Sequence, residues 1–138
     1  MPGFFRKDAC EKEYKLGKVL GTGSFATVRL ATSKADGKEY AVKIIKKKDL
    51  SVEDREGLQM EVEILQKVDH PNIVNLHQIF DTKDTFYMVM ELMTGGELFD
   101  RIVDKGNYTE EEARLVVKQL ANALKYCHDF GVVHRDLK

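Results

Sequence analysis

Two glycines spaced by one residue stand between two runs of alternating apolar residues near the start of the chain. The stretch reads VLGTGSFATVRL and covers residues 19–30. Glycine has no Cβ, so the backbone N–H groups of such a turn can approach a ligand closely. Successive N–H groups also form a concavity that suits phosphate oxygens. The same spacing suits an ordinary hairpin turn, so the rest of the chain has to distinguish the two interpretations.

The length of 138 residues corresponds to one ordinary domain. Hydrophobic residues make up 43% of the chain, enough for a core, and charged residues make up 33%, which favours a soluble surface. The 22 basic and 23 acidic residues nearly cancel, so nothing in the charge balance points to nucleic acid or to an anionic membrane. The local basic run, Lys46-Lys47-Lys48, is expected to be a solvated strand exit.

The two cysteines, Cys10 and Cys127, lie far apart and form no C-x-x-C pair. This predicts free thiols in a reducing compartment, with a single disulfide left open as the alternative. No apolar run is long enough for a transmembrane helix. The first residues lack the hydrophobic region of a signal peptide, and Pro2 stands where N-myristoylation needs glycine. We therefore expect a cytoplasmic location, with the nucleus as the other option.

Hydrophobic periodicity predicts an α+β fold that follows a flexible lead-in over residues 1–13. Alternation predicts five strands, and three- to four-residue spacing predicts three helices, one of them between the third and fourth strands. The expected strands cover 14–20, 26–31, 38–45, 73–80 and 85–90. The expected helices cover 51–68, 97–105 and 109–129.

Local signals mark the ends of these helices. Ser51 with Asp54 has the form of an N-cap, and Thr109 with Glu112 forms a T-x-x-E capping box. Gly131 is expected to end the last helix in the left-handed conformation. One face of that helix carries apolar residues, and we expect it to be an exposed hydrophobic patch in this chain.

A lysine and a glutamate occupy unexpected places in two predicted elements. Alternation puts Lys43 between Ala41 and Ile45 on one face of the third strand, while helical spacing puts Glu61 on the apolar stripe of the helix over 51–68. A charge taken out of water needs a partner, so the two residues are predicted to form one ion pair, with the lysine aimed at phosphate oxygens. The alternative is a carboxylate at the rim of the helix face that extends to water.

A dinucleotide-binding fold is the competing interpretation of the glycine turn. In that fold the turn opens directly into a helix and carries a third glycine. Here the turn leads into an alternating, strand-like run, and Ala26 occupies the place of the third glycine. Dinucleotide binding is therefore disfavoured.

The chain closes on VVHRDLK, residues 132–138. Alone, His134-Arg135-Asp136 is a common tripeptide that suits a loop with a local salt bridge. Here it follows a long predicted helix and lies downstream of the glycine turn, the strand lysine and the helix glutamate, in that order. With these motifs the sequence resembles the eukaryotic protein kinases from about Tyr14 onward.

Three further segments are similar to the calcium/calmodulin-dependent group of serine/threonine kinases, which includes the calcium-dependent kinases of plants and protists. They read HPNIV at 70–74, GGELFD at 95–100 and YTEE at 108–111. The resemblance implies a kinase N-lobe over 14–92, with a five-stranded antiparallel sheet and one regulatory helix. It implies a hinge and an incomplete helical C-lobe over 93–138.

The resemblance also implies which residues bind the nucleotide. Residues 21–28 would form the loop over the ATP phosphates, Val28 and Ala41 would enclose the adenine ring, and Met90 would be the gatekeeper. The backbone of Glu91 and of Met93 would hydrogen-bond the base. The complete nucleotide-binding set is Leu20, Gly21, Thr22, Gly23, Ser24, Phe25, Ala26, Val28, Ala41, Lys43, Met90, Glu91, Met93 and Glu97.

The resemblance assigns the chemistry to four residues. Lys43, paired with Glu61, would contact the phosphates. Asp136 would orient the attacking hydroxyl and accept its proton, and Lys138 would steady the transferred phosphate, as in the serine/threonine-specific subclass. Glu97 would lie near the ribose and favour a basic residue in the substrate.

The implied cofactors are ATP and magnesium, and the implied partners are protein substrates. The family's magnesium ligands, an asparagine five residues after Asp136 and the aspartate of a D-F-G motif, do not occur in the 138 residues, so no metal ligand is expected here. We expect the chain to be a piece of a longer kinase, inefficient alone, with calcium or calmodulin control acting through other segments. A non-catalytic nucleotide-binding or interaction module on a kinase scaffold is the alternative.

Overall fold

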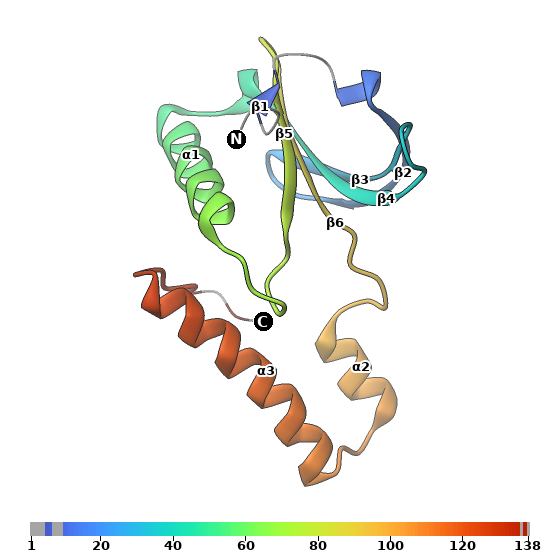
Figure 1. Cartoon of the computed structure of the whole chain (residues 1–138), viewed down its shortest axis with the longest axis vertical. Coiled ribbons are helices and arrows are strands. Elements are labelled where there is room, and N and C mark those ends of the chain that lie inside the picture. Colours follow the sequence, from blue (N-terminus) through green and yellow to red (C-terminus); the bar gives the residue numbers. More distant parts are fainter. Residues whose placement is uncertain (1–4, 7–9, 136, 138) are drawn as a thin grey trace. The chain divides into compact units, whose positions relative to one another are not determined.

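The computed structural model describes residues 5–6, 10–135 and 137 (Figure 1). Its strands form one six-stranded sheet in the order β1-β5-β6-β4-β3-β2. The strands are β1 (Phe5–Arg6), β2 (Tyr14–Thr22), β3 (Ala26–Ser33), β4 (Glu39–Lys46), β5 (Leu76–Asp81) and β6 (Thr85–Glu91). The helices are α1 (Val52–Lys67), α2 (Leu98–Lys105) and α3 (Glu110–Asp129), and short 3-10 helices lie at η1 (Cys10–Lys12) and η2 (Lys47–Asp49).

The five strands β2 to β6 pair with one another in antiparallel fashion, as predicted, and the predicted helix follows the third of them. The fourth predicted strand begins at Leu76 rather than at residue 73. The preceding segment instead closes a turn in which the amide of Ile73 donates to the carbonyl of His70 at 3.1 Å.

The prediction that residues 1–13 form a flexible segment is wrong for those of them that the structure describes. β1 pairs with β5 in parallel, and Cys10 of η1 is completely buried. Polar side chains tie this segment to the sheet. Tyr87 donates a hydrogen bond to Glu11 at 3.1 Å, and the amide group of Gln78 donates to Glu13 at 3.2 Å. A two-residue strand and a single 3-10 turn carry no periodicity, so the pattern could not predict them.

The sheet packs a separate core on each of its faces. The first core gathers η1 and one face of the strands, and its buried residues are Cys10, Tyr14, Ala31, Val42, Phe80, Tyr87 and Val89. The second core lies on the side of α1, and its buried residues are Ile45, Val62, Leu76, Ile79, Phe86 and Met88. Successive side chains of a strand point to opposite faces, so β4 contributes Val42 to the first core and Ile45 to the second.

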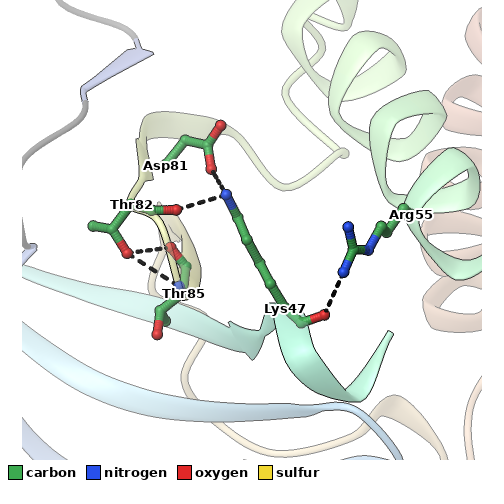
Figure 2. A network of polar contacts seen from close by, with 5 residues as sticks. All are labelled: Lys47, Arg55, Asp81, Thr82 and Thr85. Carbon is green, nitrogen blue, oxygen red and sulfur yellow. Dashed lines mark hydrogen bonds and ion pairs between the residues drawn. The ribbon is translucent and has the colours of Figure 1, made fainter. Parts of the chain in front are cut away.

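In the basic run at the end of β4, Lys46 and Lys48 are exposed, as the sequence predicts, but Lys47 is half-buried and makes specific contacts. Lys47 places its Nζ 2.5 Å from Oδ1 of Asp81 and 2.6 Å from the carbonyl oxygen of Thr82, as Figure 2 shows. In return, Arg55 of α1 donates to the carbonyl of Lys47 at 3.0 Å. Thr82 and Thr85 close the turn between β5 and β6 by hydrogen-bonding each other. The network joins the end of β4 to that turn and to the start of α1.

The chain divides into two compact units, which are described separately. The first unit comprises residues 1–66 and 75–92, and the second comprises 67–74 and 93–138. Residues 67–74 belong with the second unit because they contact α3: the amide of Asp69 donates to the hydroxyl of Tyr126 at 3.0 Å, and the rings of His70 and Tyr126 lie 5.0 Å apart.

Within the second unit, the predicted helix ends are confirmed. Thr109 and Glu112 form the full capping box of α3, and Gly131 adopts a φ of 75° just beyond the helix. In the first unit, Ser51 and Asp54 bond reciprocally at the start of α1. Of the apolar face predicted for α3, Leu120 is exposed, while Val116, Leu124 and Cys127 are half-buried. In the described part of the chain, no helix is long and apolar enough to cross a bilayer.

Both cysteines are free, and they differ in burial. Burial, with the neighbouring carboxylates of Glu11 and Glu13, raises the pKa of the Cys10 thiol to about 12, whereas Cys127 is only half-buried.

Because the thiolate is the reactive form, we expect iodoacetamide at pH 8 to label Cys127 and to reach Cys10 only in denaturant. Mass spectrometry of tryptic peptides measures this. Cys127→Ser should abolish the early labelling, and equal rates at both cysteines would contradict the buried η1.

Candidate nucleotide-binding site

The glycine turn is the tight end of the hairpin between β2 and β3. Leu20, Gly21 and Thr22 belong to β2, Gly23–Phe25 form the turn, and Ala26 and Val28 belong to β3. The amide of Gly23 donates to the carbonyl of Ala26 at 2.8 Å, which closes the turn. Gly21 pairs with Val28 in the ladder, so the first glycine lies directly beside a residue of the predicted adenine site.

Neither glycine of the turn is required by the fold itself. Neither Gly21 nor Gly23 has a positive φ. A Cβ built on Gly21 would meet no atom within 4 Å, and one on Gly23 would meet only the carbonyl oxygen of Ala26, at 3.8 Å. The absent side chains therefore leave the backbone open rather than relieve strain or crowding, and an open backbone is what phosphate oxygens need in order to reach N–H groups.

The predicted ion pair between Lys43 and Glu61 is present. Nζ of Lys43 lies 3.0 Å from Oε1 and 3.4 Å from Oε2 of Glu61, so both carboxylate oxygens face the ammonium group. The two side chains are 27% and 43% exposed, respectively, so the pair lies at the edge of the second core rather than within it. The buried residue of α1 is Val62, which sequence reasoning missed, and Glu61 flanks it.

The face of the sheet that carries Lys43 also carries three other predicted nucleotide-binding residues. In the ladder, Val28 pairs with Lys43 and Ala41 pairs with Met90, and paired residues share a face. Ala41 is two residues from Lys43 on the same strand and so shares this face as well. The strand register therefore brings together Val28, Ala41, Lys43 and Met90, although their positions span more than sixty residues of sequence.

An open cavity of about 450 Å³ lies between the glycine turn, β4 and α1. Lys43 and Glu61 line it together with Phe25 from the turn. The remaining lining residues are Gly23, Ser24, Ala26, Ile45, Leu50, Glu53, Asp54, Gly57 and Leu58. The ion pair is therefore accessible from the space next to the glycine turn, so the lysine is placed to meet an anion held there.

Sequence reasoning missed a constraint on the end of β6. The amide of Glu91 donates to the carbonyl of Asn75 at 2.9 Å, and the carboxylate of Glu91 accepts from the amide of Asn75 at 3.3 Å. The N–H of Glu91 is thus already used, so a contact from its backbone to a base would fall to its carbonyl. No periodic signal marks Asn75, because it precedes the strand.

The other predicted site residues belong to the second unit or lie outside the described residues. Met93 precedes α2, and Glu97 is its N-cap residue. Arg135 adopts a left-handed φ of 62°, which is uncommon for a residue other than glycine. Asp136 and Lys138 lie outside the described residues. Among the residues that are described, no group of three or more His, Cys, Asp or Glu side chains is arranged to hold a metal ion.

The sequence matches the protein kinase domain family over residues 14–138. The chain belongs to the protein kinase family. This agrees with the geometry, because the glycine turn, the strand lysine and the helix glutamate occur in the order and the elements that the family uses. The resemblance drawn from the motifs is confirmed, as is the kinase-like α+β fold.

Curated relatives of this kinase chain carry names from one branch of the family. A probable myosin light chain kinase of Dictyostelium discoideum is 52% identical over 126 residues, which cover 91% of this chain and 39% of that protein. Myosin light chain kinase A of the same organism is 48% identical, over 93% of this chain and 43% of that protein. Calcium/calmodulin-dependent protein kinase type 1 of Caenorhabditis briggsae is 49% identical, over 100% of this chain and 41% of that protein. The chain spans about two fifths of the length of these relatives.

The partial exposure of the ion pair predicts a small effect on stability. Exposed and half-exposed pairs contribute about 1 kcal/mol or less, so Glu61→Gln is expected to lower the free energy of unfolding by no more than about that amount. Urea denaturation measures this. Glu63→Gln is the control: Glu63 is a neighbour of Glu61 on α1, and among the contacts described it bonds only to Gln59. A loss of several kcal/mol in Glu61→Gln alone would contradict a pair at the edge of the core.

Proposed function

We propose that the chain forms the ATP-binding part of a protein serine/threonine kinase, and that the whole protein transfers the γ-phosphate of ATP to Ser or Thr hydroxyls. The observation that carries the proposal is the ion pair between Lys43 and Glu61, at 3.0 Å, opening into the cavity beside the glycine turn. A lysine held by a carboxylate keeps its direction, and it is available to a phosphate group.

Each part of the site has a proposed task in holding the nucleotide. Phosphate oxygens approach the bare backbone of the glycine turn and meet its N–H groups, except that of Gly23, which already donates to the carbonyl of Ala26. Lys43 binds a phosphate as a point charge, and Glu61 keeps the lysine from swinging into solvent. Val28 and Ala41 provide an apolar surface for the base. When bound, magnesium ATP supplies the phosphoryl group, and its metal ion neutralises charge between the phosphates.

Substrates and regulation belong to the same proposal. We infer protein substrates from the kinase relatives and a preference for a basic residue near the phosphoacceptor from Glu97. Asp136 is the proposed acceptor of the hydroxyl proton, and Lys138 the proposed contact to the transferred phosphate. The names of the relatives support control by calcium and calmodulin. A cytoplasmic or nuclear location is proposed as well.

Lys43→Met tests the phosphate site. Loss of a charge-assisted contact to phosphate is expected to weaken ATP binding by about tenfold or more while leaving adenosine binding unchanged, since adenosine has no phosphate. Isothermal titration of both ligands measures the two affinities. Lys48→Met removes the same charge from an exposed position in η2 and should behave as the wild type. Equal ATP affinity in Lys43→Met and the wild type would overturn the placement of the phosphate site.

Asp136→Asn tests the reaction itself. In the whole protein, transfer of phosphate from ATP to a serine peptide with nearby arginines should fall by about a hundredfold or more, because the proton acceptor is lost. ATP affinity should stay the same, since the residue acts on the hydroxyl. Incorporation of labelled phosphate measures transfer. If wild-type protein binds ATP but transfers nothing to any serine or threonine peptide, the non-catalytic module becomes the better account.

A further inference from the structure

Strand β2 loses its regular register twice as it approaches the glycine turn. Leu16 pairs with Ala31, Val19 pairs with Arg29, and Gly21 pairs with Val28. Between the first two pairs β2 advances three residues while β3 advances two, and between the last two pairs it advances two residues while β3 advances one. Each step leaves one extra residue on β2, which is the signature of a β-bulge and bends the strand locally.

The first bulge is held by a side chain. Arg29 of β3 directs its guanidinium group at the carbonyl oxygen of Gly17, with Nε at 2.9 Å and Nη2 at 2.6 Å. Two donors of one planar group on one oxygen fix both the distance and the direction of that carbonyl. In the described part of the chain, no ion pair of Arg29 is found, so its charge is directed at the backbone.

Gly17 lies against Leu30 of the neighbouring strand. A Cβ built on it would come within 3.4 Å of the carbonyl oxygen and 3.5 Å of the Cβ of Leu30. These distances are ordinary van der Waals contacts, so a methyl group at this position would touch β3 without a severe clash. The contact that holds the bulge is therefore the pair of hydrogen bonds from Arg29 to the carbonyl of Gly17.

Arg29 lies on the face of the sheet away from the nucleotide site. It pairs with Val42 in β4, whereas Val28 pairs with Lys43. Its side chain thus cannot be a ligand of a nucleotide bound beside Lys43. It acts on the site only through the register of β2, which decides that Gly21 is the residue placed next to Val28.

We propose that Arg29 is a positioning residue of the kinase site: by holding the bulge at Gly17, it fixes where the glycine turn stands relative to Lys43. The inference rests on the proposed function for its effect on ATP, and on the hairpin geometry alone for its effect on the turn. Loss of the guanidinium leaves the bulge free to move, and the N–H groups of the turn then no longer converge on one phosphate position.

Arg29→Met, which keeps the length of the side chain but removes its donors, tests the inference. Amide hydrogen exchange of residues 17–24 should become about tenfold faster, while exchange in β4 and β6 stays unchanged. ATP should bind about tenfold more weakly, and adenosine as in the wild type. Arg29→Lys retains the charge and one donor, so both effects should be intermediate. The control is Lys15, an exposed residue of β2 that pairs with Thr32. Lys15→Met removes the same charge and should match the wild type.

The outcomes separate the two proposals. Unchanged exchange of residues 17–24 in Arg29→Met overturns the inference whether or not ATP binds. Faster exchange with unchanged ATP affinity reduces Arg29 to a structural residue, and an equal loss of ATP affinity in Lys15→Met reduces the effect to long-range charge. Failure of the wild-type chain to bind ATP overturns the proposed function, and the exchange experiment then still decides whether Arg29 fixes the turn.

Discussion

Strand β4 has to be covered on both faces, and the rest of the first unit is arranged around that requirement. It lies between β3 and β6, and its alternate residues enter the two cores. A shift of one residue would exchange the faces, so Val42 and Ile45 determine the register of the whole strand. The same register leaves Lys43 on the α1 side, where it pairs with Glu61. Helix α1 therefore covers a core and supplies the carboxylate for the charge at the edge of that core.

The ion pair is weak as a source of stability because both partners reach water. Its importance is geometric: β4 and α1 are each fixed by apolar packing, through Ile45 and Val62, and the pair joins two side chains whose backbones are already in place. A lysine fixed in this way is directed by the fold rather than by its own flexible stem. The bulge held by Arg29 applies the same logic to the opposite wall of the site, where a backbone segment is held by a side chain behind it.

Much of this arrangement could be predicted from the sequence, because it depends on period and on local caps. Alternation around Lys43 and helical spacing around Glu61 predicted a contact between residues eighteen positions apart, and the structure contains it. The capping box at Thr109 and the turn at Gly131 were also predictable, since such signals act within a few residues. Val62 was missed because the stripe assigned to α1 was centred one residue too early, on Glu61.

The features that could not be predicted are long-range and aperiodic. The pairing of β1 with β5 and the burial of Cys10 depend on a segment with no repeat. The contact between Lys47 and Asp81 joins one charge in a basic run to another at the end of β5, and nothing in the run distinguishes Lys47 from its neighbours. Asn75 and Arg29 act on backbone groups, whose availability is decided by strand register. Sequence patterns describe side-chain faces well, but they do not show which carbonyl or amide is left without a ladder partner.

The glycines of the turn have a further consequence, which concerns how such a sequence evolves. Glycine in a strand costs about 0.5–1 kcal/mol relative to alanine, and Gly21 has both the backbone conformation and the space to accept a methyl group. Mutation followed by selection for a stable hairpin alone would therefore tend to replace it. Replacing Gly21 by alanine would thus be expected to stabilise the isolated hairpin, and a ligand that needs the bare backbone would have to offset that gain through its binding free energy.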